Sequence, residues 1–125
     1  MLEEIIVTVD DRPGILADIG ELLGNEGVNI ETLSASTHNG NGVIHLVCDD
    51  EGDATEILKS HGFKIEAVNP VMNVTIDDRP GELGRYCRRL ADHGVAIKAA
   101  YVAKRTGGET ELIFAVDDLD SAQKA

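Results

Sequence analysis

The chain contains the same motif twice. The heptapeptide DDRPGIL begins at Asp10, and the related DDRPGEL begins at Asp77. The similarity extends beyond the motif, because IIVTV (5–9) matches MNVTI (72–76) and NEGVNI (25–30) matches DHGVAI (92–97). After one extra residue, which we place in the next turn, VIHLVCDD (43–50) matches ELIFAVDD (111–118). Since an internal repeat fixes the architecture, we expect one small unit written in two copies.

Each copy alternates strand and helix patterns. In the first copy, β-branched and alternating residues predict strands over 4–9, 28–37, 43–48 and 63–68. An apolar stripe after the motif predicts a helix that Asp11 caps, with Pro13 in its first turn and Gly27 at its end. Asp53 is expected to cap a short second helix that stops at Gly62. The predicted order is therefore βαββαβ.

This order predicts an α+β, ferredoxin-like module. Two split βαβ halves give a four-stranded antiparallel sheet in the order 4-1-3-2, with both helices on one face. We expect the first module at residues 1–69 and the second at 70–125. The second copy has strand patterns at 72–76, 97–104 and 109–116, but it lacks equivalents of residues 58–68. Its last helix should therefore be short and its fourth strand missing.

The missing strand leaves the predicted strand 72–76 with an open edge, and open edges recruit partners. Two alternatives follow. Strand 63–68 lies beside 72–76 and fills the vacancy, or another chain fills it and second strands pair between chains. A unit of about 60 residues buries too little surface to be robust alone. Either alternative predicts a homo-oligomer, most simply a homodimer.

Composition argues against several classes of function. The net charge of −12 repels phosphate backbones, which argues against nucleic-acid binding. No apolar run approaches the roughly 20 residues of a membrane span, and the N-terminus enters a strand pattern without a signal peptide. We expect a cytoplasmic protein in which Cys48 and Cys87 are reduced. The sequence holds no catalytic motif and no metal-binding spacing, so we expect neither an enzyme nor a cofactor.

A strand, then DRPGxL opening a helix, then GVNI entering a second strand, resembles the ACT domain family. The resemblance covers nearly the whole chain as two tandem copies, the second truncated. It implies a regulatory module that binds a free amino acid at an interface between paired modules. It also implies that a partner enzyme of amino-acid metabolism responds. No catalytic or DNA-binding segment accompanies the two copies, so we expect a stand-alone regulatory protein.

The candidate ligand-binding residues lie in the motif loop and the GVNI segment of the first copy: Asp10, Asp11, Pro13, Gly14, Ile15, Leu16, Asn29 and Ile30. The two aspartates suit an ammonium group, and the helix start offers N–H groups to a carboxylate. Asn29 can donate and accept. In the serine-sensing members that the chain resembles, Asn stands at the position of Asp11 and His at the position of Val9. Asn29 is retained, and the departure at Val9 argues against serine itself.

The second copy is expected to hold a weaker site or none. It keeps part of the motif loop, with candidate residues Asp78, Gly81 and Leu83. Ala96 replaces Asn29, and Glu82 replaces Ile15, which places a charge where a ligand carboxylate would lie.

Two other interpretations stay open. Asp, Pro and Gly are good helix-start residues whether or not a ligand binds. A protein-interaction module without a metabolite would instead dock a partner through its open strand edge or its basic cluster of Arg85, Arg88, Arg89 and Lys98. Ligand binding predicts a concavity beneath residues 10–16, whereas a scaffold predicts a flat loop with satisfied polar groups.

Overall fold

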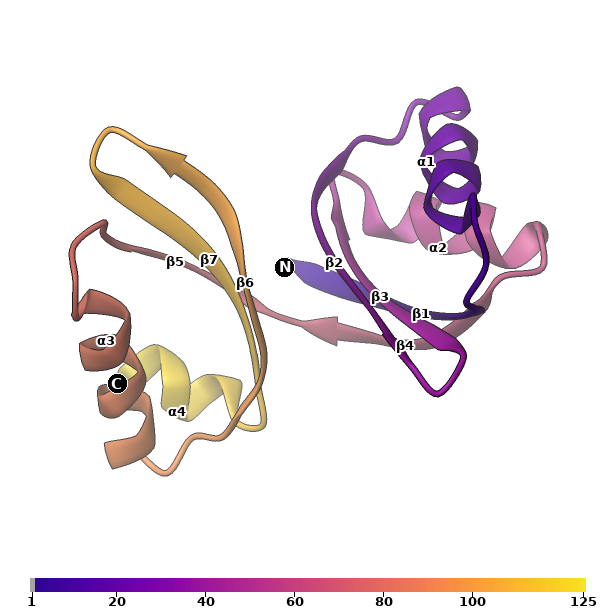
Figure 1. Ribbon diagram of the computed structural model, residues 1–125. Helices are drawn as coiled ribbons and strands as arrows, with labels where there is room; N and C mark the ends of the chain where they lie inside the picture. The colour runs from indigo at the N-terminus through magenta and orange to yellow at the C-terminus, as the bar shows by residue number, and fades with distance from the viewer. Residues whose placement is uncertain (1) are drawn as a thin grey trace. The chain divides into compact units, whose positions relative to one another are not determined.

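The computed structural model describes residues 2–125, and the chain divides into two compact units, residues 3–69 and residues 70–125 with Leu2. The first unit contains β1 (Glu3–Asp10), α1 (Ile15–Asn25), β2 (Ile30–His38), β3 (Asn41–Cys48), α2 (Glu51–Ser60) and β4 (Lys64–Pro70). The second contains β5 (Met72–Asp77), α3 (Glu82–Asp92), β6 (Ile97–Thr106), β7 (Glu109–Val116) and α4 (Leu119–Lys124) (Figure 1). The predicted repeat is confirmed, with the order βαββαβ in the first unit and βαββα in the second.

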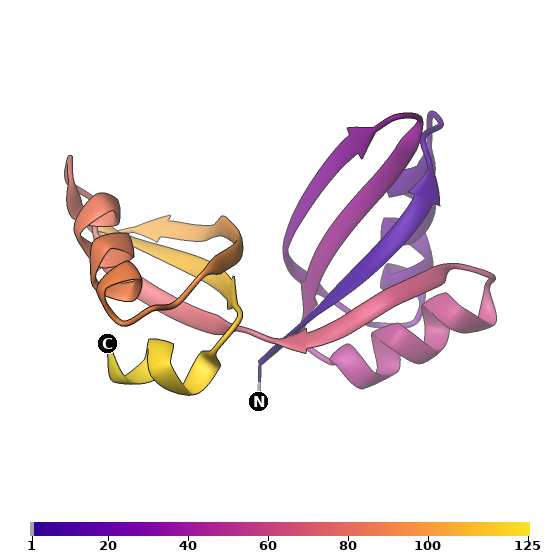
Figure 2. The same cartoon turned by 90° about the horizontal axis from the view of Figure 1, so that it is seen from below.

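The sheet of the first unit has the strand order β2-β3-β1-β4, which is the predicted order read from the other edge. Both views place α1 and α2 on the same face of this sheet (Figures 1 and 2). That face carries the core, because alternate residues of β1 and β3 point toward the helices. The buried residues of this core are Ile5, Val7, Ile19, Leu23, Val28, Ile44, Leu46, Cys48, Ala54 and Leu58.

The second unit has a three-stranded sheet in the order β5-β7-β6 and a core of its own. The buried members of that core are Met72, Leu90, Val95, Leu112, Phe114 and Ala122. Strand β4 pairs with β1 in the first sheet, so the alternative in which residues 63–68 fill the edge beside β5 is wrong. Within residues 2–125, β5 remains an edge strand of its sheet.

The repeated RPG motif forms a tight turn in front of the helix. Gly14 has left-handed backbone angles, φ 88° and ψ −2°, and the Ile15 N–H donates to the Arg12 carbonyl over 3.4 Å. Proline at the second position and a positive-φ glycine at the third are the residues that a type II turn prefers. Gly81 repeats this geometry in the second unit at φ 89° and ψ −13°. The motif is therefore explained in both copies by turn chemistry.

The predicted cap of the first helix is wrong for the same reason. Because the turn occupies residues 12–15, α1 begins at Ile15 with Gly14 at the cap position and no side-chain cap. Pro13 lies in the turn and not in the first helical turn. The Asp11 backbone N–H instead donates to the Gly40 carbonyl at 3.0 Å, which ties the motif loop to the β2–β3 hairpin.

The cap of α2 is one turn earlier than predicted. Asp50 has extended backbone angles, and its Oδ1 accepts from the Asp53 N–H at 3.0 Å. Asp50 is therefore the cap, and Asp53 supplies the N–H that it satisfies. Asp118 plays the same part for α4, since it accepts from the Ser121 N–H at 3.1 Å.

We expect Asp50→Ala to lower the free energy of unfolding by about 1 kcal/mol, because it leaves the Asp53 N–H without its acceptor. Urea unfolding followed by circular dichroism measures the change. Asp50→Ser keeps an acceptor and should lose only a few tenths of a kcal/mol. Equal losses in the two variants would contradict the capping role.

The extra residue of the second copy lies in a strand and not in a turn, contrary to our prediction. Both hairpins have two-residue turns with positive φ, at residues 39–40 and 107–108. These are type I′ loops, which match the twist of the flanking strands. The pairing of β6 with β7 shifts between Val102 and Lys104, so Ala103 is an inserted bulge residue.

Across residues 2–125, no helix is long and apolar enough to cross a membrane.

Candidate ligand-binding site

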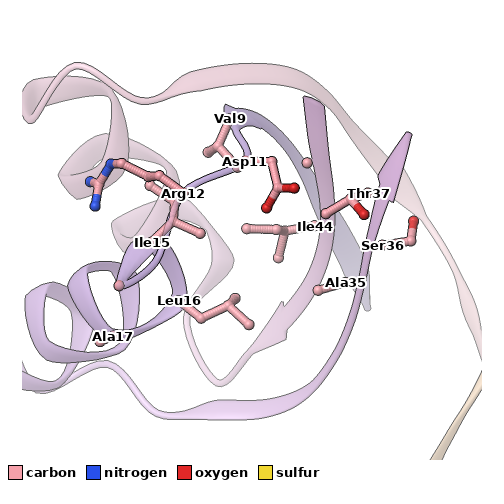
Figure 3. A pocket seen from close by; sticks show the side chains of 12 residues that line it. Val9, Asp11, Arg12, Ile15, Leu16, Ala17, Ala35, Ser36, Thr37 and Ile44 are labelled. Carbon is pink, nitrogen blue, oxygen red and sulfur yellow. The ribbon is translucent and has the colours of Figure 1, made fainter. Parts of the chain in front are cut away.

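A cavity of about 600 Å³ lies between the start of α1 and the helix-side face of the sheet in the first unit (Figure 3). Four segments line it: the motif loop with the first turn of α1, the end of β1, the end of β2 and the start of β3. The lining residues are Val9, Asp11, Arg12, Gly14, Ile15, Leu16, Ala17, Ala35, Ser36, Thr37, Gly42 and Ile44. Small-molecule sites commonly have volumes of about 300–1,000 Å³.

Strand register brings the floor of the cavity together. Gly42 of β3 lies opposite Val9 of β1 on one side and opposite Thr37 of β2 on the other. Two residues further along β3, Ile44 lies opposite Ala35. Because side chains alternate along a strand, these five positions share the helix-side face. The start of α1 forms the opposite wall.

The Asp11 carboxylate is the charged group that faces this cavity. Figure 3 shows it directed into the space bordered by Ile44, Thr37 and the start of α1. The Arg12 guanidinium points away and pairs with Asp18, with 2.6 Å between Nη2 and Oδ2. No side chain among residues 2–125 pairs with the Asp11 carboxylate. The cavity therefore combines apolar walls with one unpaired anion.

The structure brings four of the predicted site residues together: Asp11, Gly14, Ile15 and Leu16 all line the cavity. Asp10 does not reach it, since this residue lines a neighbouring hollow of about 320 Å³ with Asn41 and Lys64. Pro13 lines neither space, and its carbonyl accepts from the Arg12 guanidinium at 3.2 Å. The motif loop thus supplies one wall of the cavity.

Asn29 and Ile30 lie at the far end of β2. The Asn29 N–H donates to Asp49 Oδ1 at 3.0 Å, and the Asp49 N–H donates to the Asn29 carbonyl at 3.1 Å. Six residues separate Asn29 from Ala35, which is about 20 Å at roughly 3.3 Å per residue of strand. Ile30 packs against the core. Within one module, the structure does not bring these two residues to the motif loop.

Sequence reasoning missed the lining residues on β1 and on the hairpin: Val9, Ala35, Ser36, Thr37, Gly42 and Ile44. It also missed Arg12 and Ala17. A signal for the hairpin residues exists, because the two Asn-Gly pairs predict a turn that returns β3 alongside β1. The register that this turn imposes places residues 35–37 and 42–44 beneath the motif loop.

The second unit places charged groups at the matching positions. Glu82, the counterpart of Ile15, accepts from Arg79 at 2.9 Å and from Arg85 at 2.5 Å. The hydrogen bond from Arg85 holds the pKa of Glu82 below its usual value. Gly81 lies in the turn, and the Asp78 backbone N–H donates to the Gly108 carbonyl at 2.9 Å. Leu83, the counterpart of Leu16, is exposed.

Cys48 is a buried thiol beside acidic residues. Burial raises its pKa from 9.0 to about 11, and the charges of Asp49, Glu51 and Glu31 act in the same direction. The thiol of the unfolded chain ionises near pH 9, whereas the folded chain keeps the thiol neutral to higher pH. The neutral thiol therefore contributes to the stability of the fold. This contribution, at most about 2–3 kcal/mol, is complete below pH 9 and is lost as the pH rises toward 11.

We therefore expect Cys48→Ala to flatten the alkaline stability profile. Urea unfolding at pH 8 and at pH 10.5 should show a smaller loss in the variant than in the parent chain. Cys87→Ala is the comparison, because burial also raises the pKa of Cys87, but this thiol is only partly buried and its removal should flatten the profile less. An unchanged profile in Cys48→Ala would mean that other groups cause the alkaline loss.

Within residues 2–125, no group of three or more His, Cys, Asp and Glu residues is placed to hold a metal ion.

Comparisons with known proteins agree with the fold. The sequence model of the ACT domain family matches residues 4–67. The chain is similar to protein BT0572 from Bacteroides thetaiotaomicron, with a TM-score of 0.89 and 19% identity over 99% of this chain and 85% of that one. It is also similar to the ligand-free regulatory subunit of aspartate kinase from Thermus thermophilus, with a TM-score of 0.74 and 16% identity over 98% of this chain and 89% of that one. A search of curated proteins found no match. At these identities the structural likeness establishes the fold alone.

Proposed function

The chain belongs to the ACT domain family, and we propose that it is a non-catalytic regulatory protein that binds a free amino acid in its first module. The observation that carries this proposal is the cavity with the unpaired Asp11 carboxylate in its wall. A free amino acid presents an ammonium, a carboxylate and a side chain. Asp11 suits the ammonium, the first turn of α1 offers N–H groups to the carboxylate, and apolar walls suit the side chain.

The proposal depends on the cavity and not on the repeated motif. Turn chemistry accounts for Pro13 and Gly14, and the same turn recurs in the second unit. Nothing about that turn requires the open space beneath it. The space arises from the hairpin residues and from the apolar Ile15, whose counterpart Glu82 is held by two arginines.

We place a second copy of the chain at the edge of β2. This strand lies at the edge of its sheet, and two large apolar side chains near the cavity, Leu16 and Leu33, are 43% and 42% exposed. Antiparallel pairing of β2 with β2 of a second copy would bury both. Such pairing brings the start of one β2 strand to the end of the other. Asn29 of one chain would then complete the site around Asp11 of its partner.

The response is a shift in assembly that a partner enzyme detects. A ligand changes an equilibrium only through different affinities for its two states, so the amino acid must favour one packing of the paired modules. Two similar structures are regulatory subunits of aspartate kinase, which supports an enzyme of amino-acid metabolism as the partner. The two free cysteines suit the reducing conditions of the cytoplasm.

A panel of the common amino acids in a thermal-shift assay tests this function. A ligand at 100 times its dissociation constant adds about 2.7 kcal/mol of stability, a shift of several degrees for units of this size. We expect Asp11→Asn to remove the shift, because the ammonium loses its charged acceptor. Asp78→Asn changes the matching residue of the second copy and should leave the shift intact.

If no amino acid shifts the melting of the well-folded chain, the interaction-module interpretation replaces this proposal. A specific feature favours that second candidate. The edge of β5 is open, and α3 carries Arg85, Arg88 and Arg89 along an otherwise acidic chain. A shift that survives Asp11→Asn would instead place the ligand elsewhere on the protein.

A further inference from the structure

We propose that the amino acid bound by the first module has an aliphatic side chain, and that Gly42 is the residue that admits it. This inference rests on the proposed function and adds to it a ligand class and a specificity-determining residue. Two independent observations carry it: the chemistry of the cavity floor, and the difference between the two copies of the repeat at the position of Gly42.

The floor of the cavity offers a ligand side chain almost nothing polar. Val9, Ile44 and Ala35 form it, and Ile15 and Leu16 face it from α1. A charged or amide side chain buried there would lose its water without gaining partners, which disfavours its binding. An aliphatic side chain would gain from the same burial.

The polar lining groups lie away from this floor. Ser36 alternates with Ala35 along β2, so its side chain belongs to the other face of the sheet, and Figure 3 shows its hydroxyl directed outward. Arg12 is turned toward Asp18. Thr37 is exposed and lies at the rim near Asp11. The polar end of the cavity therefore suits the ammonium and carboxylate, and the apolar end suits the side chain.

Gly42 keeps this floor open. A Cβ atom added at Gly42 would lie 2.9 Å from Val9 Cγ2, closer than real side chains approach. Its backbone does not need glycine, because the positive φ angles of this hairpin belong to residues 39–40. Glycine inside a strand costs stability and often marks a close approach of another group. Here the group that approaches is the Val9 side chain, so a residue larger than glycine at position 42 would displace Val9, which itself lines the cavity.

The second copy shows the same position filled. Thr110 lies opposite Ile76 in the β5–β7 register, as Gly42 lies opposite Val9 in the first copy. The Thr110 side chain is buried, and its hydroxyl has no hydrogen-bond partner among residues 2–125. The fold therefore accepts a buried threonine at this position in the second copy, where the first copy has glycine.

Valine and threonine give the sharpest test, because the two ligands have nearly the same shape and differ in polarity. Calorimetric titration of the full chain should show valine, leucine or isoleucine binding at least 10-fold more tightly than threonine. A methyl-to-hydroxyl exchange in an apolar pocket is typically discriminated by about 100-fold. Serine, asparagine, aspartate and lysine complete the panel. Threonine binding as tightly as valine would overturn the aliphatic assignment.

Gly42→Thr gives the first module the residue that the second module has at the matching position, Thr110. We expect it to weaken binding of leucine and isoleucine at least 100-fold, with a smaller loss for alanine, whose side chain ends before the floor. Gly20→Ala is the matched control, since a Cβ at Gly20 meets nothing within 4 Å and this residue is not in the cavity lining. Should Gly42→Thr fail to fold by circular dichroism, Gly42→Ala provides the smaller step, with an intermediate loss expected.

The outcomes separate this inference from the proposed function. Unchanged leucine affinity in folded Gly42→Thr, or tighter binding of a polar amino acid, overturns the inference and leaves an amino-acid-binding protein. Absence of binding by any amino acid to the parent chain overturns both. If neither Gly42 variant folds, the comparison of valine with threonine on the parent chain decides alone.

Discussion

Leu23→Ala should lower the free energy of unfolding of the first unit by about 2–5 kcal/mol. Leu23 is fully buried in the core between α1 and the sheet. The substitution removes buried methyl groups and leaves a cavity that the close-packed surroundings fill only in part. A unit of this size has a total stability of roughly 3–10 kcal/mol. The expected loss is therefore a large share of the whole.

Hydrogen exchange read by mass spectrometry locates the effect. Amides of β1 and β3 should lose protection in Leu23→Ala, while those of β5 and β7 keep it, because each unit has its own core. Leu90 occupies the matching position in α3 and is equally buried. Leu90→Ala should give the reverse pattern. Loss of protection in all four strands from either substitution would show that the two units unfold together.

The fold followed from the sequence because the repeat constrains it twice. Each copy presents the same succession of strand-like (period 2) and helix-like (period 3.6) hydrophobic patterns. An element that is ambiguous in one copy can therefore be assigned from its counterpart in the other. The strand order then follows from handedness rules for split βαβ halves, and the structure has that order. The two Asn-Gly pairs in residues 39–42 indicate a hairpin turn between β2 and β3, and Asn39 takes a positive φ of 52° before Gly40.

The helix starts were harder to predict because several residues could serve as caps. Around α2 the sequence offers Asp49, Asp50 and Asp53, and only backbone geometry decides that Asp50 is extended and accepts from the third residue beyond it. Before α1 the proline and glycine favour a turn as well as a helix start. The turn forms, and the helix begins after it.

Four of the twelve residues that line the cavity were predicted, and there is a physical reason for this division. Asp11, Gly14, Ile15 and Leu16 are neighbours in the sequence and come together through local structure. The other wall depends on strand register over a long separation in the chain. The prediction for Asn29 shows the difference, because the direction of β2 carries that residue to the opposite end of the sheet from residues 35–37.

The repeat also distinguishes residues that maintain the fold from residues to which we propose a role in ligand binding. Features that both copies share, such as the glycine of the turn at residues 14 and 81, are explained by backbone geometry alone. Features found only in the first copy need another reason. Gly42 against Thr110 and Ile15 against Glu82 are such differences, and both lie where the first copy has its cavity.

Under the proposed pairing of two chains through β2, Leu33→Lys should leave the chain a monomer and weaken amino-acid binding at least 10-fold. Leu33 lies on the edge strand β2 and is 42% exposed in the single chain. A pair of lysines facing each other across a two-fold interface would repel, and lysine is a residue that keeps strand edges unpaired. Val68→Lys is the matched control, since Val68 is 39% exposed on β4, at the opposite edge of the sheet.

Sedimentation velocity and titration at two protein concentrations separate assembly from binding. If the site is shared between two chains, the affinity for the amino acid must rise with protein concentration, because binding and pairing are thermodynamically linked. A Leu33→Lys monomer that bound with full affinity would show that the Asp11 cavity holds the ligand without help. Asn29 would then not belong to the site, and ligand binding would not be coupled to assembly. If Leu33→Lys loses both dimerisation and amino-acid binding, the β2 edge is the element that couples the bound amino acid to assembly.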